Sequence, residues 1–127
     1  MNVEKIVFCF FIVLALTLNF GFFIGDIDNP DHHNVYELFA ALVVSLIATI
    51  LKFGERTQMG ALLLATSLVA DLQLIIAAII WASALYITEV GLTSSVMSSI
   101  VSLSGGALLA NLMSVVLLII ETTHLRR

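Results

Sequence analysis

The stretch TSLVADLQLII, residues 66–76, places an aspartate, Asp71, and a glutamine, Gln73, inside an otherwise apolar run. What that aspartate does depends on the solvent around the run. Of the 127 residues, 61% are hydrophobic and 11% are charged, whereas soluble domains carry about 25% charged residues. A soluble domain of this length would expose many side chains, and this chain has too few polar ones to cover its surface. We therefore expect lipid to surround most of the chain.

Four apolar segments are long enough to cross a membrane as helices, which takes roughly 20 mainly apolar residues. The connectors between them are short, so successive helices are expected to be antiparallel neighbours. The apolar runs do not alternate with a period of two, which excludes a transmembrane β-barrel. The sequence therefore predicts an all-α integral membrane protein, an up-and-down bundle that forms one domain over residues 1–127. The predicted spans are about 3–25, 34–53, 58–87 and 94–122.

The basic residues all lie at one set of helix ends. Lys5 lies near the start of the first span, Lys52 and Arg56 flank the second connector, and Arg126 and Arg127 end the chain. Because positive residues accumulate on the cytoplasmic side, we expect a multi-pass plasma-membrane protein with both termini in the cytoplasm. The aromatic residues expected at the outer boundary, where amphipathic rings prefer to lie, are Tyr36, Trp81 and Tyr86.

Asp71 falls near the middle of the third span. A charged aspartate at that depth costs roughly 2.5–3.5 kcal/mol on insertion scales, so it should face protein or water rather than lipid. Gln73 points almost the opposite way, because two residues turn a helix by about 200°. The third span is therefore expected to be covered on both sides. Asp71 shares its stripe with Gly60, Ser67, Ala78 and Ala82, and Gln73 shares one with Thr66, Ala70, Ala77 and Ala84.

The fourth span offers a partner for the third. It carries a ladder of small residues, one every four positions, which permits close helix packing. Asn111, with Ser104 and Ala107, forms an adjacent polar face at about the depth of Asp71. The segment Ser104–Gly106 is also expected to let the helix bend or break, because Ser-Gly pairs favour kinks. The ladder consists of Ser98, Ser102, Gly106, Ala110 and Ser114.

Asp71 has two interpretations. It can be structural, as a protonated side chain bonded to Asn111, Ser67 or another subunit, since burial favours the neutral form of a carboxyl group. It can instead be a proton or cation site, since ionisable residues inside a membrane commonly mark such paths. The candidates for an ion pathway are Asp71, Gln73, Asn111 and Ser67.

The connector GDIDNPDHHNVYE, residues 25–37, is the most polar part of the chain. Its acidic residues begin with the spacing of a calcium-binding loop. Pro30, however, takes the place of a ligand residue, and Asp31 takes the place of the glycine that such a loop requires. The adjacent histidines His32 and His33 do not define a metal site, and we expect none. In an oligomer, the acidic side chains repeated around an axis would form a vestibule that concentrates cations. They are Asp26, Asp28, Asp31 and Glu37.

Several functional classes are disfavoured by the sequence. The net charge of −4 leaves no basic patch for nucleic acid. No hydrolase or metalloprotease motif is present, so we expect neither an enzyme nor a cofactor. The first span lacks the intramembrane glutamate of small multidrug transporters. The segment TEVGL, residues 88–92, is not a potassium-channel filter.

Two functions remain. The leading hypothesis is a cation or proton channel or transporter subunit that assembles as a homo-oligomer, because one bundle of four helices leaves little room for a central pathway. Asp71 would be its intramembrane site. The alternative is a non-transport accessory subunit or assembly factor of a larger membrane complex. In both cases the lipid bilayer is the surrounding partner.

Overall fold

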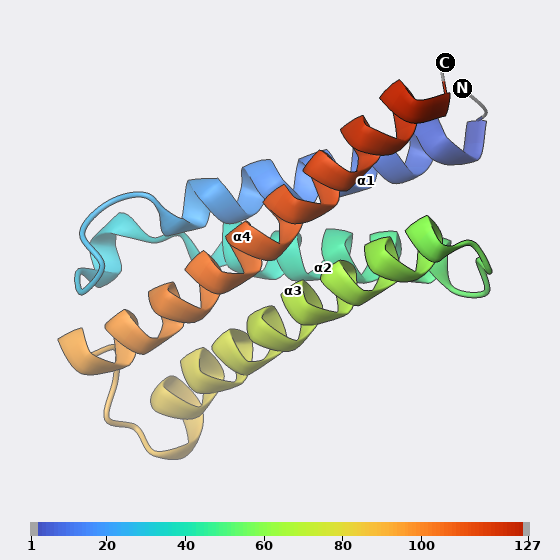
Figure 1. Ribbon diagram of the computed structural model, residues 1–127. Coiled ribbons are helices and arrows are strands. Elements are labelled where there is room, and N and C mark those ends of the chain that lie inside the picture. Colours follow the sequence, from blue (N-terminus) through green and yellow to red (C-terminus); the bar gives the residue numbers. More distant parts are fainter. Residues whose placement is uncertain (1–2, 126–127) are drawn as a thin grey trace.

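The chain folds into four helices that are long and apolar enough to cross a membrane, as predicted (Figure 1). The computed structural model describes residues 3–125, and no strand occurs among them. Arg126 and Arg127, which the orientation argument used, lie outside the described residues. The helices are α1 (Val3–Phe23), α2 (Val35–Lys52), α3 (Gln58–Ala82) and α4 (Ser94–Leu125), with a 3-10 turn η1 (Pro30–His32) and a π-helical turn η2 (Ser83–Ile87) that continues α3.

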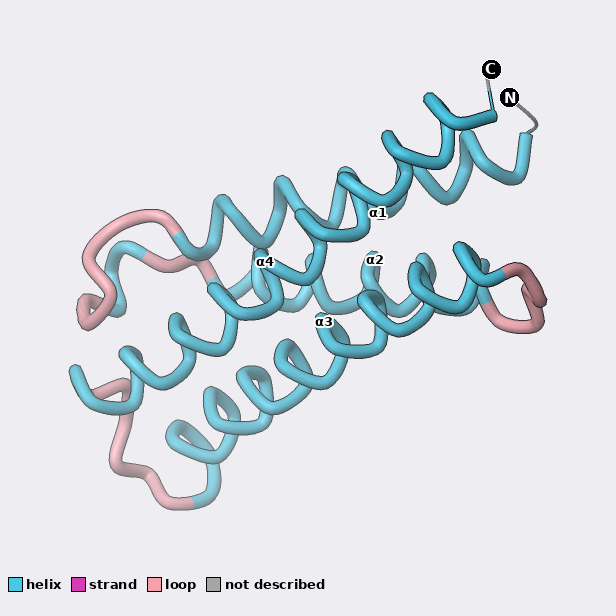
Figure 2. Tube along the Cα trace, viewed as in Figure 1, coloured by secondary structure: helices cyan, strands magenta, loops and turns pink. Residues whose placement is uncertain are grey.

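The four helices form a closed ring. α1 packs on α2, α2 on α3, and α3 on α4, and α4 returns to pack on α1. The start of α1 and the end of α4 lie together, at the end of the bundle that also holds the α2–α3 connector (Figures 1 and 2). We call this the basic end, because Lys5, Lys52 and Arg56 lie there. The opposite end carries the connector 24–34, and we call it the acidic end.

The buried residues of each helix recur at alternating intervals of three and four. This spacing is typical of helices that pack at a shallow angle in coiled coils and four-helix bundles. It places one narrow seam of each helix in the core and leaves the rest outside. On α3 the seam is Gly60, Leu63, Ser67, Ala70, Leu74, Ala77 and Trp81, and on α4 it is Met97, Ile100, Ser104, Ala107, Asn111, Ser114 and Leu118.

The outer faces of the helices are apolar. Large side chains such as Phe10, Ile50, Leu72 and Leu109 are exposed at positions well inside the spans. No more than 39% of the most apolar window of any span is buried inside the protein. An apolar surface of this extent is stable only in contact with lipid. The bundle is therefore that of a multi-pass membrane protein.

Side chains cap the helices where the chain enters them. Asn34 accepts a hydrogen bond from the backbone N–H of Tyr36 at the start of α2, at 2.8 Å. Thr57 accepts one from Gly60 at the start of α3, at 2.9 Å. Such caps satisfy N–H groups that have no partner within the helix. These residues therefore fix where α2 and α3 begin.

Only some of the small residues of the predicted ladder on α4 contact another helix. Gly106 lies directly against the side chain of Gln73 on α3, because a Cβ atom there would come within 2.5 Å of its Oε1. Ser114 Oγ lies 2.6 Å from Thr66 Oγ1, again on α3. Ser102, by contrast, is exposed. The buried residues of α4 recur at alternating intervals of three and four. Residues spaced strictly four apart therefore do not all lie on the buried face.

One expectation about local structure was wrong. α4 does not break at Ser104–Gly106 but runs as one helix, because its glycines serve close packing against Phe23 and Gln73. The irregular backbone is η2 instead, where the N–H of Thr88 reaches the carbonyl of Ser83 at 2.9 Å. Of the aromatic residues predicted at the outer boundary, Trp81 is only 8% exposed and packs on Phe22, whereas Tyr36 and Tyr86 are exposed.

Gly106→Leu should destabilise the bundle, by about 1–3 kcal/mol, because the added side chain would overlap Gln73 in a packed seam. Ser102→Leu, on the same helix but exposed, is the matched control and should change stability little. Thermal unfolding of both variants in detergent measures the difference. Equal stability of the two variants would show that α4 does not approach α3 closely at Gly106.

Candidate functional site

Asp71 lies inside the bundle and is only 4% exposed. Two hydroxyl groups of α2 hold its carboxyl group. Ser45 Oγ lies 2.6 Å from Asp71 Oδ1, and Thr49 Oγ1 lies 2.5 Å from Asp71 Oδ2. Ser45 and Thr49 are four residues apart, so their side chains lie on one face of α2 a single turn apart. Each carboxyl oxygen therefore has one hydroxyl partner.

The second span carries a signal for these partners that the sequence analysis did not use. The segment SLIAT, residues 45–49, places two hydroxyl residues at helical spacing. Ala41 and Ala48 lie on the same buried face and are small enough to let α3 approach. A hydroxyl pair of this kind, next to small residues in an apolar run, indicates a polar contact with another helix.

The single hydroxyl hydrogen of Thr49 determines which protonation states of Asp71 the site can hold. Thr49 Oγ1 also lies 3.0 Å from the backbone carbonyl of Ser45. A threonine hydroxyl has one hydrogen, and both a carbonyl and an ionised carboxylate can only accept. If Asp71 is ionised, Thr49 donates to Asp71. If Asp71 carries a proton on Oδ2, Asp71 donates to Thr49, and Thr49 donates to the carbonyl of Ser45.

Both protonation states of Asp71 therefore fit the same arrangement of heavy atoms. Only the hydroxyl hydrogen of Thr49 rotates between them. In the ionised state the carbonyl of Ser45 still accepts the backbone hydrogen bond of its helix, so it is not left without a donor. A carboxyl group that gains and loses a proton without moving its neighbours suits repeated proton exchange.

Asp71 has no cationic partner in the part of the chain that the structure describes. The lysine–glutamate ion pairs there lie at the basic end of the bundle: Lys5 with Glu121 and Lys52 with Glu55. Hydroxyl groups alone offset little of the cost of holding a charge in a low-dielectric core. An ionised Asp71 would thus attract a proton or another cation strongly.

The other pathway candidates do not bond to Asp71. Asn111 and Ser67 are fully buried, and neither the Asn111 amide nor the Ser67 hydroxyl has a hydrogen-bond partner. Gln73 is turned toward α4, where it covers Gly106. The expected pairing of Asp71 with Asn111 or Ser67 is therefore wrong, because the hydroxyls of α2 already occupy both carboxyl oxygens.

Asn111 nevertheless lies at about the depth of Asp71. α3 and α4 are antiparallel, and two contacts between them set their register: Thr66 with Ser114, and Gln73 with Gly106. Asp71 lies between these two contacts on α3, and Asn111 lies between them on α4. The polar face expected on α4 at this depth is therefore present inside the bundle.

Several buried polar atoms in the core lack a protein partner. Ser104 Oγ donates to Asn19 Oδ1 at 2.5 Å, but the amide nitrogen of Asn19 is left unpaired. Nearly all buried polar atoms in proteins are paired, to protein or to ordered water. Among the described residues, these atoms therefore leave unused hydrogen-bonding capacity in the core on either side of Asp71. They are Asn19 Nδ2, Ser67 Oγ, Gln73 Oε1, and Asn111 Nδ2 and Oδ1.

The acidic end gathers exposed carboxylates in one short connector. Asp26, Asp28 and Asp31 are exposed, while Glu37 is partly covered and lies over Gly21. Gly25 makes the sharp turn after α1 with a φ of +112°, where a side chain would also collide with His32. Among residues 3–125, no three His, Cys, Asp or Glu side chains come close enough to hold a metal ion.

A buried lysine closes the basic end. Lys52 is at the end of α2, and its Nζ lies 3.0 Å from Glu55 Oε2 and 4.4 Å from the centre of the Phe8 ring. The hydrogen bond from Lys52 lowers the pKa of Glu55 below its ordinary value of 4.5, against the opposite effect of partial burial. The ion pair therefore ties the α2–α3 connector to α1 through Phe8.

Glu55→Gln should lower the thermal stability at neutral pH by about 1 kcal/mol, because it leaves the buried Lys52 without its counter-charge. A lowered pKa means that the ion pair contributes fully above pH 4.5 and is lost as the pH falls below it. The difference from the wild type should therefore shrink toward pH 3.5. Thermal unfolding in detergent between about pH 3.5 and 7.5 tests this. Glu4→Gln, an exposed acid at the same end, is the control, and an equal effect there would remove the role of the ion pair.

Over residues 32–122, the chain matches the model of a protein family described as a family of unknown function, DUF6394. The chain belongs to this family. The matched region holds all of α2 and α3, including Ser45, Thr49 and Asp71, and begins next to the buried His33. No curated protein and no solved structure matches the chain. Its function must therefore be argued from the geometry of the bundle.

Proposed function

We propose that this protein moves protons across the membrane, and that Asp71 is the group that takes up and releases them. The observation that carries the proposal is the pairing of both Asp71 oxygens with hydroxyl groups and with no cation among residues 3–125. The hydrogen count at Thr49 adds support, because the site accommodates the neutral and the ionised carboxyl group equally. Intramembrane carboxylates are typical of proton pathways.

The short contacts favour a proton over a metal cation. Ser45 and Thr49 touch the carboxyl oxygens at 2.6 and 2.5 Å, which leaves no space for an ion between the oxygens. A metal ion would have to push the hydroxyl groups aside and gather further oxygen ligands around itself. A proton, by contrast, fits on the contact between Asp71 and Thr49 as it stands.

Buried polar groups suggest a route to and from Asp71. Toward the acidic end lie the Asn19–Ser104 pair and the unpaired amide oxygen of Gln73. Toward the basic end lies the Thr66–Ser114 pair. Water bound at the unpaired atoms would join these groups into a chain of hydrogen bonds. The exposed acids at the acidic end would raise the local proton concentration there.

This route lies within one chain, since Asp71 faces the interior of its own bundle. The homo-oligomer expected from the sequence is thus a separate prediction, and the vestibule formed by several copies depends on it. The proposed location is the plasma membrane with both termini in the cytoplasm, because Lys5, Lys52 and Arg56 share one end. The acidic end then faces outward.

The orientation can be tested in cells by labelling engineered cysteines, with Cys9 replaced by alanine. A cysteine at Asp28 should react with a membrane-impermeant thiol reagent added outside, and a cysteine at Glu55 should react only after the membrane is opened. The reverse labelling pattern would overturn the proposed orientation and place the acidic end in the cytoplasm.

Asp71→Asn should abolish proton flux, or lower it by at least about tenfold, because an amide cannot exchange a proton in this pH range. Proton flux into liposomes containing the purified protein measures this across about pH 5–8. Ser102→Ala is the control, since it removes an exposed hydroxyl of α4 that lies outside the proposed route. Thermal unfolding of each variant separates loss of flux from loss of fold.

Equal flux from Asp71→Asn and the wild type would remove Asp71 from the mechanism. Flux of sodium or potassium ions that is lost in Asp71→Asn, with no proton flux, would replace the proton by a metal cation at the same site. No flux of any of these ions from the wild type would contradict transport. That result would favour the accessory subunit or assembly factor.

A further inference from the structure

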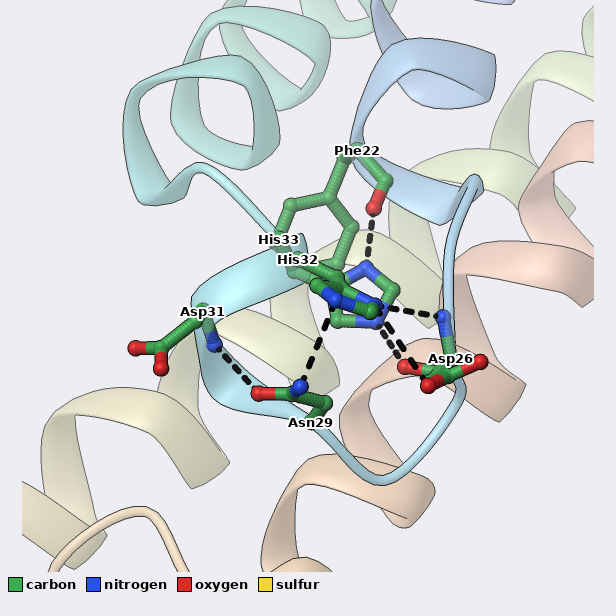
Figure 3. Close-up of polar contacts among 6 residues, drawn as sticks. All are labelled: Phe22, Asp26, Asn29, Asp31, His32 and His33. Carbon is green, nitrogen blue, oxygen red and sulfur yellow. Dashed lines mark hydrogen bonds and ion pairs between the residues drawn. The ribbon is translucent and has the colours of Figure 1, made fainter.

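The connector at the acidic end contains a buried histidine with an unusual set of partners. His33 is 4% exposed, although it lies in the most polar segment of the chain. Its Nδ1 lies 2.5 Å from the backbone carbonyl of Phe22, and its Nε2 lies 2.7 Å from the backbone carbonyl of Asp26 (Figure 3). Both ring nitrogens therefore face groups that can only accept a hydrogen bond.

A neutral imidazole cannot satisfy both carbonyls. It carries one N–H, so its second nitrogen would present a lone pair to a carbonyl oxygen, which is repulsive. The imidazolium form carries two N–H groups and donates to both. The observed geometry is therefore that of a positively charged His33. Phe22 is in the last turn of α1, where carbonyls have no partner within the helix, so His33 supplies a donor that the helix end needs.

The neighbouring histidine has the opposite requirement. His32 Nδ1 lies 2.9 Å from the backbone N–H of Asp26 and accepts a hydrogen bond from it. That nitrogen must carry a lone pair, so His32 is neutral when this bond is formed. Figure 3 shows both rings next to Asp26, the His32 ring bonded to its N–H and the His33 ring to its carbonyl. The two adjacent histidines thus differ in charge in the closed connector.

We propose that His33 is a proton-operated clip, which holds the connector 24–34 against the end of α1 when protonated and releases it when neutral. The closed connector keeps on His33 a proton that the open connector releases as the pH rises, so closure through His33 is lost at high pH. Histidine side chains ordinarily change charge between pH 5 and 8. The clip therefore responds to the acidity of the solution at the acidic end.

The titratable side chains near His33 come from several elements. Its own connector supplies Asp26, Asp28 and Asp31, and α2 supplies Glu37, whose carboxylate lies over Gly21. His32 is the other titratable group nearby. From α3 the nearest partner in this cluster is Trp81, which does not titrate and packs on Phe22. α4 carries no titratable side chain between 94 and 106, and the second connector at this end contributes the exposed Glu89.

Nuclear magnetic resonance of the ring nitrogens tests the charge state directly. The protein is labelled with nitrogen-15 at histidine, placed in lipid nanodiscs and measured between about pH 5 and 8.5. His32→Asn and His33→Asn assign the signals. Both ring nitrogens of His33 should carry a proton at pH 6. A single N–H on His33 throughout this range would overturn the proposal, whatever the variants do.

Thiol labelling tests the movement of the connector. In a Cys9→Ala background, the labelling rate of a cysteine at Phe22, which is fully buried next to His33 in the closed connector, is divided by that of a cysteine at the exposed Glu89, which cancels the intrinsic effect of pH on thiols. The ratio should rise at least about fivefold from pH 6 to pH 8, as the two charge-assisted bonds of His33 are lost.

The two histidine variants separate the clip from other titrations. His33→Asn should abolish the pH dependence of the labelling ratio. His32→Asn should keep it, because an asparagine oxygen can still accept the N–H of Asp26. A flat ratio in the wild type, or an unchanged pH dependence in His33→Asn, would contradict the clip. Proton flux plays no part in these measurements, so the result is independent of the role of Asp71.

Discussion

A carboxyl group in the middle of a bilayer must find its partners inside the protein, and this constraint sets the arrangement of the bundle. Lipid offers Asp71 nothing to bond to, so α3 has to turn this residue toward α2, where Ser45 and Thr49 reach both of its oxygens. Once α3 is turned in this way, Gln73 necessarily faces α4. The glycine at position 106 then makes room for its side chain.

Much of this architecture could be predicted from the sequence. When η2 is counted with α3, apolar length located the four spans to within three residues at each end, because a helix that crosses lipid has to satisfy its own backbone. The inward direction of Asp71 also followed from the cost of exposing it. Its partners did not follow, because hydropathy does not say which neighbouring helix offers a hydroxyl at the right depth. The spacing of the two hydroxyl residues in segment 45–49 indicated the partners of Asp71. Asn111 was considered instead, because an amide is the more strongly polar side chain.

The connector 24–34 shows a different limit of sequence interpretation. Its composition suggested a solvated turn, and Asn29 and Pro30 do form one. The burial of His33 could not be read from its neighbours, since it depends on the end of α1 lying eleven residues away in the chain. At Asp71 and at His33, the protonation states that fit the structure follow from counting the hydrogens available to the surrounding acceptors. Thr49 has one hydrogen for two acceptors, and His33 needs two hydrogens for two.

The ring order of the helices has a consequence for how the protein enters the membrane. α1 with α2, and α3 with α4, can each insert as a hairpin, since short connectors join them. The hydroxyls of Ser45 and Thr49 are in the first hairpin and Asp71 is in the second, and Asn19 and Ser104 are divided in the same way. Each hairpin alone therefore carries polar groups that lipid cannot satisfy. When the two hairpins pack together, these polar groups bond to one another and are no longer unsatisfied in lipid. The polar contacts in the core therefore stabilise the association of the two hairpins.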